Sequence, residues 1–532
     1  MSPIRVLAGL LMCWLLGSVG DGVQADVKLP PFFSDHMVLQ RDAKAPIWGT
    51  AGAGEKVTVR FRDQERRATA DENGNWRIEL SGLKAGGPDD LIVAGKNTIE
   101  LQDVLVGEVW VGSGQSNMAG SVGIYVNHDP VLAKLAAQTY PQIRGCTAER
   151  AWTVSSAEAN RGYSALLFAM AVRLHEELDV PVGMMLGAVG ASPSGCWLSP
   201  AALAADEPSQ KLLAEYAKEY PATLKQYETE VARWNENAAK LKAAGKPVGR
   251  MNLLPPYLPG TVNGQPIGIL YKRYIQPFVG YGIRGVLWDQ GEARTQVGGV
   301  DQYTLMGALI RGWRQEWNVG EFPFLYVQKP SGNGCAWEAP APKSSEPVAA
   351  AGAVSLPPVI QPCTDLPRSP HTTPEGLYVE DYVKMLRYPN VGMVISTDLG
   401  PGIHPIVKSG YGSRAAQVAL AVAYGKPVEY YGPIYDSHTI EGGAVRVKFT
   451  HVGRGLAMRH RTQLQGFAVA GEDRVFHWAD AKIDGESVVV SSSKVPRPTA
   501  VRYAWGPINN RTWANLFNQD GLPAVTFRTD AW

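Results

Sequence analysis

The chain has 532 residues, of which 45% are hydrophobic and 19% are charged, and this length predicts two to four domains rather than a single core. Its 51 Lys and Arg residues nearly balance 50 Asp and Glu residues, for a net charge of +1. This balance excludes the strongly basic field that draws a protein to nucleic acid or to an anionic membrane, so we expect no nucleic-acid partner.

The first 25 residues have the pattern of a secretory signal peptide. Arg5 is followed by an apolar stretch from Val6 to Leu16, and Val23-Gln24-Ala25 forms a small-residue cleavage site before Asp26. No later segment approaches the ~20 apolar residues of a membrane span. We therefore expect a secreted or periplasmic protein without a membrane span.

Four cysteines follow the signal peptide, and the sequence leaves their pairing open. Cys335 and Cys363 flank a segment rich in Pro, Ala and Ser, so a bridge between them would close a long loop. Export favours oxidised thiols, but spacing alone does not establish which cysteines meet. The other two cysteines are Cys146 and Cys196.

Residues 26–103 predict a small all-β domain. The stretch KVTVRF alternates apolar and polar residues, and the turn residues 71–75 separate it from WRIEL and NTIEL. A second β pattern covers residues 426–532, with AVRVKFTHV, LQGFAVAG, ESVVVSSS and VRYAW as its strands.

Between these parts, residues 104–425 alternate apolar strands with amphipathic helices. This order predicts an α/β fold with a parallel sheet and helices on both faces. The expected helices are 164–178, with Ser164 as N-cap, and 303–317. The expected strands are 104–111, 182–189, 285–288, 322–328 and 391–397. A charged, Ala-rich stretch at about 208–246 predicts a helical insertion, either a solvated helical pair or a lid.

The residues that follow the predicted strands include the groups that a serine hydrolase needs. Ligands of open parallel sheets bind outside the carboxyl ends of the strands. A hydroxyl, small residues with free N–H groups, an amide and an imidazole occur at these positions. Each has a plain structural alternative, since serines cap helices and most single histidines are structural. The residues are Ser116, Gly190-Ala191-Ser192, Gln290-Gly291-Glu292, Gln328 and His404.

The sequence resembles the SGNH hydrolases and, more closely, the sialate O-acetylesterase family of carbohydrate esterases. The order and spread of the matching blocks carry the resemblance, because together they cover nearly the whole mature chain. The blocks are LPPFFSDHMVLQRDAKAPIWGTA, VWVGSGQSNM, VLWDQGEA, GIHP and VRYAWGPINNRTWANLFNQDGLPAVTFRTD. The resemblance implies an SGNH or flavodoxin-like sheet flanked by the two β domains.

The same resemblance implies roles for individual residues. The serine of GQSNM is the family's nucleophile, which corresponds to Ser116, and the histidine of IHP is its base, which corresponds to His404. The N–H groups of Ser116 and Gly190, with the side chain of Gln290, would bind the oxyanion. We place Gln115, Asn117, Glu292 and Arg294 beside the substrate.

The chain departs from the family pattern in the acid that orients the histidine. Relatives often have an acidic residue two or three positions before the histidine, where this chain has Gly402 and Pro401. The nearest acid upstream is Asp398, which reaches His404 only if the loop between them folds back. Otherwise the pair works as a dyad, oriented by a backbone carbonyl or a distant carboxylate.

Arg294 stands where the family often has a neutral asparagine. It would bind a substrate carboxylate such as that of a sialic acid if it faces the cleft. The alternative is that it pairs with Glu292 or lies on the surface. No spacing of His, Cys and acidic residues suggests a metal site, and we expect no metal and no cofactor.

The leading hypothesis is an exported serine esterase that removes O-acetyl groups from sialic acids through Ser116 and His404. One alternative is an acetyl xylan esterase or an esterase of another polysaccharide. A third is a catalytically weakened carbohydrate-binding protein, suggested by the missing acid and by Arg294.

Overall fold

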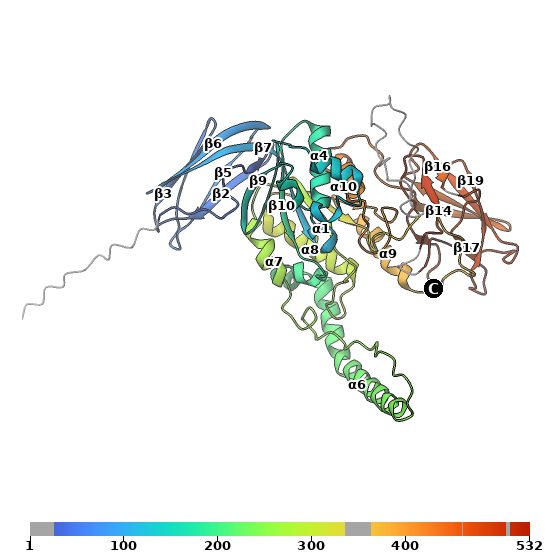
Figure 1. The fold of residues 1–532 in the computed structure, drawn as a ribbon. Helices are drawn as coiled ribbons and strands as arrows, with labels where there is room; N and C mark the ends of the chain where they lie inside the picture. The colour runs from blue at the N-terminus through green and yellow to red at the C-terminus, as the bar shows by residue number, and fades with distance from the viewer. Residues whose placement is uncertain (1–25, 336–362, 460, 507–510) are drawn as a thin grey trace, which may run out of the picture.

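A computed structural model describes residues 26–335, 363–459, 461–506 and 511–532 (Figure 1). The predicted signal peptide, residues 1–25, lies outside the described residues. N-terminal β sheets, a central α/β region and C-terminal β sheets follow one another along the molecule (Figure 1). No helix among the described residues is both long and apolar enough to cross a membrane.

The central region is built on a mixed sheet whose strands are mostly parallel. Strands β10, β7, β11, β12 and β13 lie side by side in that order, all parallel, and β8 and the antiparallel β9 extend the β10 edge. Numbered along the chain, the first five run 2-1-3-4-5, an order of doubly wound sheets. The bounds are β7 Thr98–Gly114, β8 Ile143–Thr147, β9 Arg150–Val154, β10 Val182–Ala188, β11 Gly285–Asp289, β12 Phe324–Val327 and β13 Val391–Val394.

Helices cover both faces of this sheet, which explains why its strands are apolar on both sides. A Cβ at Gly112 of β7 would meet Leu167 of α4, and α4 packs against α10. On the other face, the ring of Trp288 in β11 stacks edge-on with that of Trp313 in α8. The bounds are α1 Ser116–Ala119, α2 Val122–Tyr125, α3 Pro130–Ala136, α4 Ala165–Leu178, α5 Pro200–Ala205, α7 Ile269–Tyr274, α8 Gln302–Trp317, α9 Glu375–Lys384 and α10 Lys408–Val422.

The α4 prediction is confirmed, including its cap, because the Ser164 side chain accepts a hydrogen bond from the N–H of Leu167. The insertion is a single helix, α6 Glu207–Ala243, which projects from the body (Figure 1). The expectation of a helical pair is therefore wrong, because the chain returns from Lys246 to Leu258 without a helix. Pro221 lies within α6, and Asp206 caps its start by accepting from the N–H of Ser209.

The N-terminal sheets share a strand with the central sheet. The first half of β7 pairs with β6 and β1, and its second half pairs with β10 and β11. The predicted boundary between residues 103 and 104 therefore lies inside one continuous strand. The remaining bounds are β1 Val38–Gln40, β2 Ala45–Thr50, β3 Lys56–Phe61, β4 Gln64–Thr69, β5 Asn75–Leu80 and β6 Gly86–Ala94.

The described residues of the C-terminal part form two four-stranded antiparallel sheets and one two-stranded sheet around a core of its own. A disulfide joins Cys335 to Cys363, while Cys146 and Cys196 are free and buried. The strand bounds are β14 Ile434–Glu441, β15 Ala444–Thr450, β16 Leu456–Met458, β17 Phe467–Ala470, β18 His477–Trp478, β19 Asp480–Asp484, β20 Ser487–Ser491, β21 Ala500–Tyr503, β22 Leu516–Asn518 and β23 Phe527–Arg528.

Candidate active site

Ser116 is the first residue of α1, directly after the central strand β7. The turn between them is tight, because the N–H of Gln115 donates to the carbonyl of Asp289 at 2.8 Å. Gly114 has φ +126°, and a Cβ there would lie 2.2 Å from that same carbonyl oxygen. Only glycine fits this position, so the backbone itself presents the serine at the carboxyl edge of the sheet.

The imidazole of His404 lies against this serine. His404 Nε2 and Ser116 Oγ are 2.7 Å apart, although 288 residues separate them in sequence. His404 belongs to an exposed loop of bends between β13 and α10. The fold thus brings together the two residues for which a nucleophile and a base were expected, at a distance suited to proton transfer.

Asp398 does not contact His404. Its carboxylate is fully buried and accepts hydrogen bonds from both terminal nitrogens of Arg414, at 2.5 and 2.7 Å. Within the described chain, the second ring nitrogen of His404 has no hydrogen-bond partner. The geometry is therefore that of a Ser–His dyad, and Asp398 belongs to a buried ion pair with α10.

Gly190 lies beside the serine, but the Gln290 amide is engaged elsewhere. A Cβ built on Gly190 would lie 3.8 Å from Ser116 Cβ, which places these two residues side by side. Neither of their N–H groups is used in a hydrogen bond within the described residues. The Gln290 amide is buried and donates to the carbonyls of Ser192 at 3.1 Å and Arg294 at 3.2 Å. Gln290 therefore holds two loops together instead of pointing at an oxyanion.

A buried group of charges lies behind the serine. Lys329 donates to Asp289, to Glu292 at 3.1 Å and to Ser331 at 2.9 Å. Burial alone would lower the pKa of Lys329, but the carboxylates of Asp289 and Glu292 raise it above its ordinary value. Burial also raises the pKa of Asp289, while Lys329 opposes this effect.

The residues expected beside the substrate divide into two groups. Gln115 donates to the Glu292 carboxylate, and the Asn117 amide bonds to the carbonyl of Ile403, so all three act within the protein. Arg294 is exposed, and its guanidinium lies 4.6 Å from the centre of the Tyr378 ring. The alternative in which Arg294 pairs with Glu292 does not hold, since Glu292 binds Lys329 and Gln115.

Sequence reasoning missed the two buried lysines near the site. Lys408 is the first residue of α10, and its Nζ donates to Asn117 Oδ1 at 2.5 Å. Lys329 follows β12, in the position where strand ends supply functional residues, which is the one signal that would have found it. Lys408 carries no comparable signal, because a lysine at a helix start is usually exposed.

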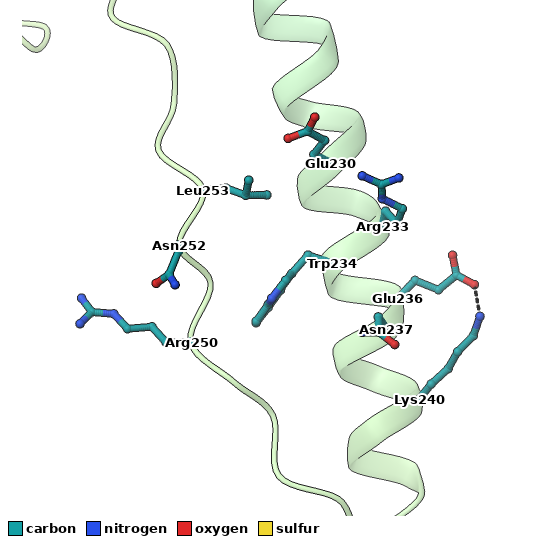
Figure 2. A pocket seen from close by; sticks show the side chains of 9 residues that line it. All are labelled: Glu230, Arg233, Trp234, Glu236, Asn237, Lys240, Arg250, Asn252 and Leu253. Carbon is teal, nitrogen blue, oxygen red and sulfur yellow. Dashed lines mark ion pairs between the residues drawn. The ribbon is translucent and has the colours of Figure 1, made fainter. Parts of the chain in front are cut away.

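A hollow on the insertion helix lies away from this site. A cavity of about 690 Å³ separates α6 from the segment 250–253, and Figure 2 shows the Trp234 ring turned toward that segment. Since a helix rises ~1.5 Å per residue, Trp234 lies roughly 40 Å along α6 from Glu207. Neither Ser116 nor His404 lines this cavity, so it is separate from the candidate site.

Comparisons with known proteins agree with the motifs. No family model matches the sequence. The sialate O-acetylesterase of Homo sapiens is 25% identical in an alignment 573 residues long, which covers 97% of this chain and 94% of the human protein. That of Rattus norvegicus is 26% identical over 363 residues, which cover 60% of this chain but less than two thirds, 63%, of the rat protein.

A solved structure extends the similarity to the fold. The crystal structure of a carbohydrate acetylesterase from Xanthomonas citri superposes with a TM-score of 0.72 and is 28% identical. It covers 95% of this chain and all, 100%, of that protein, so the likeness includes the central sheet and both flanking β regions. Over nearly its whole length the chain is therefore similar to sialate O-acetylesterases and to a carbohydrate acetylesterase, and this similarity supports a carboxylic ester hydrolase.

Proposed function

We propose that this protein is an exported serine esterase that hydrolyses O-acetyl esters of sialic acids by a Ser–His acyl-enzyme mechanism. The observation that carries the proposal is the 2.7 Å contact between Ser116 Oγ and His404 Nε2. The contact lies at the carboxyl edge of the central sheet, where open α/β sheets bind their ligands.

In the first step, Ser116 Oγ attacks the acetyl carbonyl carbon while His404 Nε2 takes the hydroxyl proton. The tetrahedral intermediate collapses when the bond to the sugar oxygen breaks, and the imidazolium returns the proton to that oxygen. Water then repeats the sequence on the acetyl-Ser116 ester, releasing acetate and restoring the hydroxyl. Imidazole suits both directions because it changes protonation near neutral pH.

The developing oxyanion needs donors that are already in place. The N–H groups of Ser116 and Gly190 meet this need, because they lie on neighbouring residues and are unused within the described chain. Gln290 supports them indirectly by tying Ser192 to Arg294, which fixes the loop that follows Gly190.

Sialic acid is the proposed substrate because curated relatives are named sialate O-acetylesterase and because Arg294 is available. Its guanidinium is exposed, is stacked on Tyr378, and forms no ion pair with a described carboxylate. A guanidinium binds a carboxylate through two parallel hydrogen bonds, and sialic acids carry a carboxylate that neutral sugars lack.

Another acetylated polysaccharide, including xylan, is the second candidate, favoured by the likeness to the Xanthomonas citri carbohydrate acetylesterase. A substitution at Arg294 distinguishes the two candidate substrates. Arg294→Gln should raise KM for O-acetylated sialic acid by about tenfold through loss of the charged pair, and should leave KM for an aryl acetate unchanged. Equal KM changes on both substrates would remove the case for sialic acid.

Export is proposed from residues 1–25 and is supported by the Cys335–Cys363 disulfide, since such bonds form in oxidising compartments. N-terminal sequencing of protein recovered outside the cytoplasm is expected to begin at Asp26. Recovery with Met1 intact would contradict the export proposal.

The decisive test measures acetate release from O-acetylated sialic acid, acetylated xylan and an aryl acetate, with wild type and Ser116→Ala. Ser116→Ala is expected to lower kcat by about 10³-fold or more on every substrate that the wild type cleaves. Retained activity would overturn the mechanism, and sugar binding by a wild type inactive on all three esters would favour a carbohydrate-binding protein.

A further inference from the structure

His404 lies on a loop that is exposed to solvent. The segment 401–404 forms bends rather than regular structure, and Ile403 is 41% exposed. Asp398 is bound to Arg414, and no described residue bonds to the second nitrogen of the His404 ring. The position of the imidazole therefore depends on whatever holds the backbone of this loop.

Asn117 provides such a hold. It follows Ser116 directly, is 0% exposed, and donates from Nδ2 to the carbonyl of Ile403 at 2.9 Å. Ile403 directly precedes His404. Two consecutive residues of the nucleophile segment thus bond to two consecutive residues of the base segment, through Oγ and Nε2 at one position and through the amide and the carbonyl at the other.

Lys408 determines which way the Asn117 amide points. Its Nζ donates to Asn117 Oδ1 at 2.5 Å, and the carbonyl of Ile403 can only accept, so the oxygen of the amide faces the lysine and the NH₂ faces Ile403. The Lys408 nitrogen also lies over the rings of Tyr125 and Tyr411, at 4.7 and 4.6 Å. This packing leaves the lysine little freedom to move.

The charged groups around Lys408 do not remove this contact. The pKa of Lys408 is raised by the nearby carboxylates and lowered by a second lysine; these groups are Asp289, Glu292 and Asp129, and Lys329. Burial lowers the pKa of Lys408 to about 7, and Asp289 opposes that shift. A lysine amine keeps N–H donors in both protonation states, so its hydrogen bond to Asn117 remains available on either side of neutrality.

We propose that Asn117 is a positioning residue: its amide, oriented by Lys408, fixes the His404 loop so that the imidazole meets the Ser116 hydroxyl. The inference rests on the proposed function of Ser116 and His404. It assigns to Asn117 and Lys408 the orienting task that an acid performs in a triad, but through the loop backbone instead of the ring.

The test compares the same substitution at two asparagines that bond to this loop. Asn117→Asp keeps the acceptor for Lys408 but replaces the donor to Ile403 with a repelling oxygen. Asn333 Oδ1 accepts from the N–H of Gly402 at 2.7 Å, and its Nδ2 has no partner within the described chain, so Asn333→Asp keeps the contact it makes. Both changes add one negative charge near the same loop.

With an aryl acetate, Asn117→Asp is expected to lower kcat by up to about 10²-fold, since a displacement of ~1 Å can cost that much, with KM changed less than about threefold. Asn333→Asp is expected to lose about threefold at most. Asn127→Asp, at an exposed position, controls for charge alone. Equal kcat for Asn117→Asp and wild type, or equal losses at Asn117 and Asn333, would overturn the proposal.

Lys408 gives a second test that does not depend on the folding of Asn117→Asp. Lys408→Met removes the donor to Asn117 and should lower kcat about tenfold, whereas Lys408→Gln restores a neutral donor and should recover most of that loss. Equal kcat in the two variants would contradict the orienting role. Activity that survives Ser116→Ala would instead overturn the proposed function, which keeps the two failures distinct.

Discussion

Ser116 and His404 lie 2.7 Å apart, yet the chain holds them by different means. Ser116 begins α1 just after the central strand β7, and the backbone there is fixed by main-chain contacts such as that between Gln115 N–H and the Asp289 carbonyl. His404 lies on a surface loop that side chains hold from two sides, Asn117 at Ile403 and Asn333 at Gly402.

The comparison teaches that the proposed nucleophile is placed by the fold, while the proposed base is placed by a few polar contacts. Main-chain placement in a packed sheet tolerates little change, because every shift disturbs neighbouring strands. A loop held by side chains yields locally when one contact is lost. Substitutions that disturb the backbone around the serine should therefore appear mainly as lost stability, and loss of a side-chain contact to the histidine loop mainly as lost turnover.

The largest expected effect is the loss of kcat when Ser116 or His404 is substituted. Ser116→Ala, His404→Ala and the double variant should each lose about 10⁴-fold in kcat, because residues that act as a unit do not contribute additively. Ester-cleavage assays of the folded proteins measure this. Losses in the double variant equal to the product of the single losses would show that the two residues act independently.

The next effect concerns the acid that was expected beside His404. Asp398→Asn removes one partner of a buried pair and leaves Arg414 without its carboxylate, which should lower the free energy of unfolding by about 3–5 kcal/mol. Urea denaturation measures this change. A variant of unchanged stability whose kcat falls tenfold would instead place Asp398 in a triad.

A matched pair of glycine substitutions tests the two sides directly. Gly114→Ala combines φ +126° with a Cβ 2.2 Å from the Asp289 carbonyl oxygen, whereas Gly402 has φ +72° and open space around it. Gly114→Ala should lower the free energy of unfolding by about 3 kcal/mol, and Gly402→Ala by about 1 kcal/mol. Similar losses measured in urea would contradict the difference between strand and loop.

The smallest effect is a pH dependence that comes from Lys408. Its folded pKa is about 7 against an ordinary value of 10.5, so between these pH values the unfolded chain holds a proton that the folded chain does not. The free energy of unfolding of the wild type should therefore rise, relative to Lys408→Met, by on the order of 2 kcal/mol from pH 7 to pH 9. Parallel pH profiles for the two proteins would contradict the buried state of Lys408.

The sequence predicted those parts of the fold that have a strong local pattern. The apolar runs at 182–189 and 285–288 became β10 and β11, and Ser164 caps α4, because short buried strands and caps are encoded by neighbouring residues. The continuity of β7 was not predictable in this way, since NTIEL alternates and VLVGEVWV does not. Strand β7 lies in a sheet with one exposed face along its first part and in a sheet buried on both faces along its second part.

Within the site, family motifs indicated which residues meet but not how their side chains are used. Gln290 and Asn117 occupy motif positions, yet their amides are directed into the protein by partners far away in sequence. The sequence analysis selected Asp398 because it is close to His404 along the chain. Its actual partner is Arg414, which lies 16 residues further on, in α10. Such pairings depend on tertiary packing that a single sequence does not display.

The continuous strand β7 has a practical consequence for dissecting this protein. A recombinant fragment that starts at Val104 would begin inside strand β7. It would expose the apolar edge of that strand where β6 and β1 are paired in the intact protein. The N-terminal sheets therefore cannot be removed as a separate module, and the smallest unit expected to express without aggregating keeps them attached to the central α/β region.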